Sequence, residues 1–163
     1  MHILINKKNL TFHNYKVKCA IGKRGIGYKR KEGDFITPKG IYKIKYILYR
    51  KDRVKKPFTK IKSFAIKKNM GWCDDIKDKK NYNKLINIKK KIHHEKLYRK
   101  DMKYDLVLLI KYNFKKNIVG KGSCIFLHLT NNYQPTAGCI ALKKKDFLIM
   151  LKLINKESKI KIF

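Results

Sequence analysis

A histidine and a cysteine stand close together in the stretch GSCIFLHLTNNYQPTAGCIAL, near the C-terminal end of the 163-residue chain. His128 ends an apolar run, and a short polar turn leads from it to Cys139. An imidazole that can take the proton of a thiol makes the sulfur a nucleophile toward carbonyl carbon atoms. The pair therefore predicts cysteine chemistry, although on spacing alone a core histidine and a buried cysteine remain the simpler interpretation.

Gly138 stands directly before the cysteine and adds a second chemical element. A glycine there leaves room for a substrate carbonyl beside the backbone, so we expect the N–H groups of Gly138 and Cys139 to be free donors for an oxyanion. One such donor lowers an activation barrier by about 2.7–4 kcal/mol. We also expect His128 to lower the pKa of the Cys139 thiol from about 8.5 into the range of about 3.5–7.5.

A mainly β framework is predicted to position these groups. Alternating or continuous apolar runs predict strands over residues 15–21, 41–49, 104–112, 122–129, 139–142 and 160–163. In all we expect about six to eight short strands in one domain over residues 1–163.

One helix completes the expected fold. Residues 143–155 are amphipathic, with lysines on one side and an apolar face made of Phe147, Leu148, Leu151 and Ile154. The less regular segment 50–103 is too long for an idle connection, so we expect a substrate-binding loop or lid there.

Composition bounds the class of protein. With 44% hydrophobic and 12% aromatic residues, the chain is too apolar to be intrinsically disordered. Its net charge of +32 would suit nucleic acid, but 38 of the 43 basic residues are lysine, which lacks the bidentate fork of arginine. We interpret the lysines as a compositional bias, and expect no specific nucleic-acid binding and only weak attraction to anionic envelope polymers.

Other special sites are not expected. No apolar run exceeds five residues, which predicts no membrane span. His93 and His94 beside Glu95 could form a metal or proton-relay cluster, but we favour a polar loop. No CxxC pair occurs among the four cysteines, Cys19, Cys73, Cys124 and Cys139, so a zinc site is not expected. We also expect no other metal and no cofactor.

Two separated motifs resemble a known family. The first is His128 followed, after a loop, by Thr136-Ala137-Gly138-Cys139, and the second is GDFITPKGIY at residues 33–42. Together they are similar to the L,D-transpeptidase catalytic domain of the YkuD type, over about residues 19–142. Ala137 stands where the commoner family motif has a second histidine.

The resemblance implies a fold, which is a mixed β-sandwich or barrel of the L,D-transpeptidase type, as well as a reaction and site residues. Cys139 would attack the carbonyl after the third residue of a peptidoglycan stem peptide and form a thioester, with His128 as the base. The Leu129 carbonyl would hold the imidazole in the useful tautomer, and Gly138 would lie at the oxyanion. We expect substrate contacts from Thr136, Trp72, Asp74 and Asp75; for the two aspartates, a turn with solvated carboxylates is the alternative.

The predicted function is that of a cysteine L,D-transpeptidase that cross-links stem peptides. The alternatives are an L,D-carboxypeptidase with the same site and a basic polyanion-binding module without catalysis. The substrate implies the periplasm or cell envelope. The N-terminal residues lack the apolar segment of a secretory signal, so the chain would be cytoplasmic if its start is correct and no other export route exists.

Overall fold

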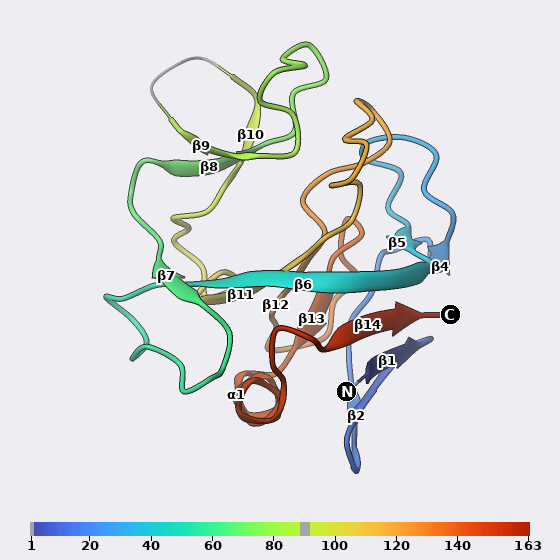
Figure 1. Ribbon diagram of the computed structural model, residues 1–163, viewed down its shortest axis with the longest axis vertical. Coiled ribbons are helices and arrows are strands. Elements are labelled where there is room, and N and C mark those ends of the chain that lie inside the picture. Colours follow the sequence, from blue (N-terminus) through green and yellow to red (C-terminus); the bar gives the residue numbers. More distant parts are fainter. Residues whose placement is uncertain (1, 89–91) are drawn as a thin grey trace.

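Nine strands form one mixed sheet around β6, the longest strand described. The computed structural model describes residues 2–88 and 92–163. The order across the sheet is β13 (Ile140–Leu142), β12 (Phe126–Leu129), β11 (Leu106–Ile110), β6 (Gly40–Tyr49), β14 (Lys159–Ile162), β1 (His2–Asn6), β2 (Asn9–Phe12) and β3 (Tyr15–Lys18), with β7 (Ser63–Ala65) also beside β6 (Figure 1).

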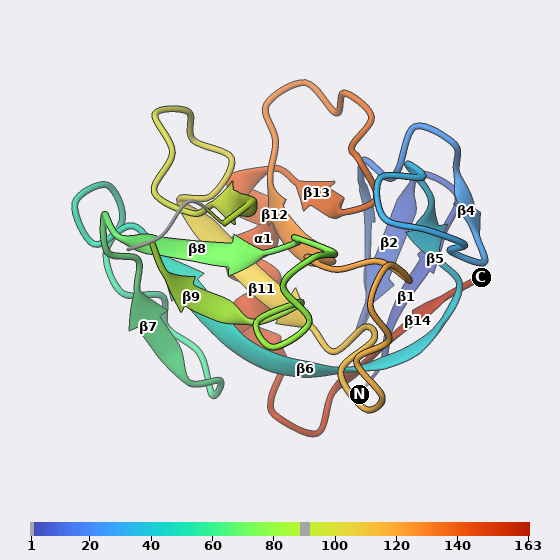
Figure 2. The ribbon, with the colours of Figure 1, turned by 90° about the horizontal axis from the view of Figure 1, so that it is seen from above.

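The sheet curls until its two ends meet (Figure 2). Just after β3, the Ala20 N–H donates to the Ala141 carbonyl of β13 at 2.8 Å, and the Ala141 N–H donates back at 3.0 Å. A second bridge joins Gly22 to Thr136. The result is a nearly closed, barrel-like mixed sheet, which confirms the predicted fold class.

One short helix, α1 (Lys144–Leu153), packs against the main core. It buries Phe147, Met150 and Leu151, residues whose spacing of three and four places them on one face. Leu148 was predicted on this face but is only partly buried, and Met150 takes that place.

A smaller sheet lies beside the main one and is built from the long segment before β11. Its strands are β8 (Met70–Cys73), β9 (Leu85–Asn87) and β10 (His94–Lys96). Trp72 of β8 packs edge-on against Phe126 of β12, with 5.5 Å between ring centroids. The segment predicted to be irregular therefore contains a packed sheet, which covers one side of β12. A further pair, β4 (Ile26–Gly27) and β5 (Thr37–Pro38), runs parallel.

Two details of the strand prediction are wrong. The described residues form fourteen strands, more than expected, because several contain only two to four residues. The strand predicted over 122–129 begins only at Phe126, since Cys124 has a φ of 53° in the left-handed region. Cys124 is therefore not on the same strand as His128.

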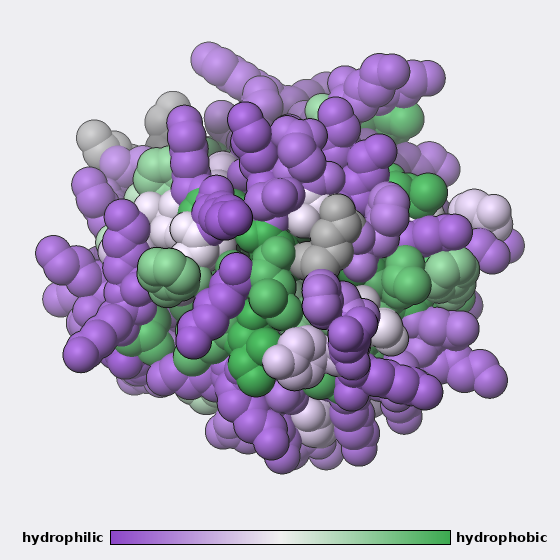
Figure 3. Space-filling model, turned by 60° about the horizontal axis from the view of Figure 1, so that its bottom comes forward, coloured by the Kyte–Doolittle hydropathy of each residue, from purple (hydrophilic) through white to green (hydrophobic). Residues whose placement is uncertain are grey.

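The surface is dominated by polar residues. Figure 3 shows a face covered mostly by hydrophilic side chains, with a narrow apolar band between them. Among the described residues, no helix has both the length and the apolar character that a bilayer crossing requires.

Candidate active site

The structure places His128 and Cys139 in the wall of one cavity of about 540 Å³. β12 and β13 pair in parallel, with His128 opposite Ala141. Because side chains alternate along a strand, Cys139, two residues before Ala141, projects to the same side of the sheet as His128. The loop between the two strands supplies more of the cavity wall, including Thr130, Pro135 and Thr136.

His128 is buried, and one ring nitrogen is already engaged. Nδ1 lies 2.9 Å from the Leu129 carbonyl oxygen, which can only accept, so Nδ1 carries the proton and Nε2 offers its lone pair. Burial lowers the pKa of His128 to about 4, against the opposing effect of the Leu129 carbonyl. At neutral pH the imidazole is therefore uncharged and able to act as a base.

Cys139 is held as a neutral thiol. Its Sγ donates to the Cys124 carbonyl at 3.0 Å and accepts from the Phe126 N–H at 3.4 Å. Burial raises the pKa of Cys139 to about 12. The expectation of a lowered thiol pKa is therefore wrong for the site without substrate, because removal of the sulfur from water outweighs every favourable contact.

The raised pKa of the Cys139 thiol has a measurable consequence. Because thiolate is the species that is alkylated, modification of Cys139 by iodoacetamide should be slower at pH 7 than that of free cysteine, and its rate should rise up to at least pH 10. Peptide mapping by mass spectrometry measures the rate at each pH, with circular dichroism to verify the fold. A rate that levels off below pH 7 would show that the thiol is ionised in the free protein.

Gly138 is required by its backbone conformation. Its φ is +139°, and a Cβ there would lie 2.9 Å from the Ile36 carbonyl oxygen. The Gly138 N–H donates to Thr136 Oγ1 at 3.1 Å. It is therefore not free, contrary to the prediction, and the Cys139 N–H becomes the candidate oxyanion donor.

Thr136 shapes the loop around the nucleophile as well as lining the cavity. In addition to accepting from Gly138, its hydroxyl donates to the Cys139 carbonyl at 2.5 Å. The Thr136 side chain thus links backbone groups that precede and follow the Cα atom of Cys139.

The three residues of segment 71–75 that were predicted to contact substrate lie in different places. Trp72 is 1% exposed and its Nε1 donates to Asn83 Oδ1 at 3.0 Å, so it supports the cavity wall from behind. Asp74 lines the cavity and lies 2.6 Å from Nδ1 of His93, whose pKa it raises. Asp75 instead accepts from the backbone N–H groups of Lys77 and His93.

The sequence interpretation missed a charged group in the cavity wall. Arg99 contacts Glu95 Oε1 at 3.2 Å, and its guanidinium lies 5.1 Å from the centre of the Tyr104 ring. All three residues line the cavity together with Lys29 and Lys103. The one feature of the sequence that could have drawn attention to Arg99 is the rarity of arginine in this chain. In the described part of the chain, no three His, Cys, Asp or Glu side chains are placed to hold a metal ion.

The comparisons with known proteins identify the family and agree with this fold. The model of the L,D-transpeptidase catalytic domain (YkuD) matches residues 1–162, so the chain belongs to this family. The resemblance stated from its motifs is thereby confirmed. A search of curated proteins found no match.

A solved structure shows the same fold at low sequence identity. The helical cell shape determining protein Pgp2 from Campylobacter jejuni superposes with a TM-score of 0.54 and 16% identity, over 99% of this chain and 46% of that one. Bd1075 from Bdellovibrio bacteriovorus has a TM-score of 0.49 and 18% identity, with the same coverage. The chain thus spans about half the length of these proteins.

Proposed function

We propose that this protein is a cysteine L,D-transpeptidase that acts on peptidoglycan stem peptides in the cell envelope. Family membership supports the general class, a peptidoglycan enzyme of the L,D-transpeptidase type. The observation that carries the finer proposal is the shared cavity of His128 and Cys139, with Nδ1 of the histidine on the Leu129 carbonyl. This arrangement leaves Nε2 as the only proton acceptor of the ring.

The first half-reaction starts from a neutral thiol and a neutral imidazole. Sγ of Cys139 attacks the carbonyl carbon after the third stem residue while its proton passes to Nε2 of His128. The oxyanion that forms accepts a hydrogen bond from the Cys139 N–H. The C–N bond then breaks, and the imidazolium returns the proton to the departing amine of the terminal D-alanine. A thioester on Cys139 remains.

The second half-reaction decides between the two activities of this site. If an amine of a second stem peptide attacks the thioester, His128 takes its proton, the thiol leaves and a cross-link forms. If water attacks, the product is a shortened stem and the activity is carboxypeptidase. The cavity carries both acidic and basic side chains at its wall, which suits substrates with ammonium and carboxylate groups.

Incubation with purified muropeptides tests the proposal. We expect mass spectrometry to detect dimers joined between third residues, together with released D-alanine. Shortened monomers alone would assign the carboxypeptidase activity instead. If neither product forms with the full-length protein, and a Cys139→Ala variant behaves identically, the proposed function is wrong.

A further inference from the structure

Thr37 contacts the nucleophile loop from a strand 101 residues earlier in the chain. The residue is fully buried in β5, and its hydroxyl donates to the Gly138 carbonyl oxygen at 2.9 Å. The hydroxyl oxygen of Thr37 itself accepts from the Gly22 N–H at 2.8 Å. Because that N–H supplies the incoming hydrogen bond, the single hydroxyl proton of Thr37 is directed to Gly138.

This contact controls the candidate oxyanion donor. The Gly138 carbonyl and the Cys139 N–H belong to one planar peptide unit, in which the two groups point in opposite directions. A hydroxyl that fixes the carbonyl on one side therefore fixes the N–H on the other. A hydrogen bond to the carbonyl also polarises the peptide unit and strengthens its N–H as a donor.

The neighbouring peptide units are fixed as well. The Thr136 hydroxyl hydrogen-bonds to the Gly138 N–H and to the Cys139 carbonyl, which belong to the peptide units before and after the one that joins Gly138 to Cys139. Thr37 hydrogen-bonds to that middle unit. The Ile36 carbonyl oxygen packs closely against Gly138 and lies 2.9 Å from the position that a Cβ would take there. Three successive peptide units around the nucleophile are thus held by two threonine hydroxyls.

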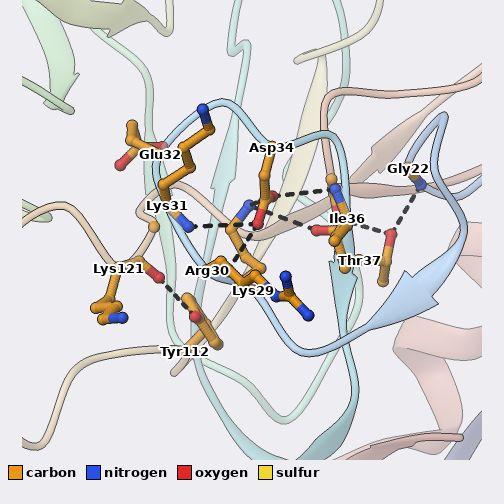
Figure 4. A network of polar contacts seen from close by, with 12 residues as sticks. Gly22, Lys29, Arg30, Lys31, Glu32, Asp34, Ile36, Thr37, Tyr112 and Lys121 are labelled. Atoms are coloured by element: carbon orange, nitrogen blue, oxygen red, sulfur yellow. Dashed lines mark hydrogen bonds and ion pairs between the residues drawn. The ribbon is translucent and has the colours of Figure 1, made fainter.

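A buried ion pair between Lys29 and Asp34 anchors Ile36, the residue before Thr37 (Figure 4). Asp34 accepts from Lys29 Nζ at 2.5 Å, from the Arg30 N–H at 2.9 Å and from the Ile36 N–H at 3.1 Å. The side chains of Lys29 and Asp34 are only 2% and 3% exposed. Burial raises the pKa of Asp34, but these hydrogen bonds outweigh it and the net pKa lies below its ordinary value.

We propose that Thr37 is a positioning residue, which orients the Cys139 N–H toward the oxyanion of the acylation step. The proposal rests on the proposed function in so far as Cys139 is the nucleophile. Loss of an oxyanion donor reduces kcat by about 10²–10³-fold. A donor that is present but poorly aligned should cost less, on the order of 10–10²-fold.

Two variants separate the hydroxyl from the rest of the side chain. Thr37→Val keeps the shape and removes the donor, whereas Thr37→Ser keeps the donor. In the muropeptide assay we expect Thr37→Val to lower kcat by about 10–10²-fold with KM within about threefold, and Thr37→Ser to restore most of kcat. The proposal fails if Thr37→Val changes KM alone, or if both variants lose kcat equally.

A second substrate keeps this test independent of the stem peptide. p-Nitrophenyl acetate transfers its acetyl group to Sγ of Cys139 and releases p-nitrophenol, a step that needs the thiol, His128 as its base and the oxyanion donor, but no stem peptide. The rate constant for this release should fall in Thr37→Val and recover in Thr37→Ser, even if muropeptides do not react. Equal rates in wild type and Thr37→Val would overturn the proposal.

Stability is controlled for in the same proteins. Thr37→Val leaves the Gly22 N–H and Gly138 carbonyl without a partner, so its folded fraction is measured by circular dichroism. If it does not fold, Thr37→Ala replaces it, because the smaller side chain leaves room for water near both groups. Acetylation by folded Thr37→Ala should be at least about fivefold slower than by Thr37→Ser, and equal rates would contradict the assigned role.

Discussion

Replacing Cys139 with serine should reduce turnover of stem peptides by about 10³-fold or more, because a serine hydroxyl is a much weaker nucleophile with an imidazole base. The change replaces one small side chain by a slightly smaller one. Its hydroxyl can still donate to the Cys124 carbonyl, as Sγ does at 3.0 Å. The loss should therefore fall on kcat, with an unchanged melting temperature, as measured by the muropeptide assay and thermal unfolding.

Cys124 provides the matched control. It is the other cysteine that lines the cavity, but its backbone carbonyl, rather than its sulfur, contacts Cys139. Cys124→Ser should therefore stay within a few fold of wild type. If Cys124→Ser abolishes turnover and Cys139→Ser does not, the two thiols have been assigned to the wrong roles.

Replacing His128 with glutamine should lower kcat/KM by about 10²–10⁴-fold, the usual contribution of a general base. The carboxamide is polar and of similar size, but it cannot accept the thiol proton. The effect should be larger here than at a site with a preformed thiolate, since burial raises the pKa of Cys139 to about 12. The variant His2→Gln, at an exposed position in β1, controls for the loss of a histidine.

The pH profile of the wild-type enzyme provides a second readout for His128. Its pKa is lowered to about 4, so the base is available above that pH and is lost as protonation proceeds below it. The acid limb of kcat/KM should therefore lie near pH 4, provided that the protein remains folded there. An acid limb at pH 6.5 or above would show that the imidazole is solvated or paired with an anion when it reacts.

Much of the framework was predictable because it depends on local patterns. The continuous apolar run predicted β11, which is buried on both faces, and the alternating pattern predicted β6, which has one face that is more solvated. The lysine and apolar spacing of α1 likewise indicated a helix near its observed limits. The short strands β4 and β5 were missed because two residues show no periodicity, and their pairing depends on partners elsewhere.

The candidate site was likewise predictable only in part. The order of His128, Gly138 and Cys139 along the chain was enough to propose nucleophile, base and a glycine turn. The order of these residues, however, does not show how far the Cys139 sulfur is removed from water. The thiol pKa was therefore predicted in the wrong direction, since desolvation by the surrounding sheet, rather than the nearby histidine, decides it.

Residue identity and chain order by themselves determined the family and the strand-rich core, and were enough to propose the chemistry of one cysteine. Only the tertiary structure decided which groups hold that cysteine's backbone. Thr37 and Gly138 meet because the curled sheet brings β5 beneath the loop before β13, across a separation of 101 residues. Hydrogen bonds of this kind form between surfaces assembled by folding, and no local pattern in either segment specifies the partner.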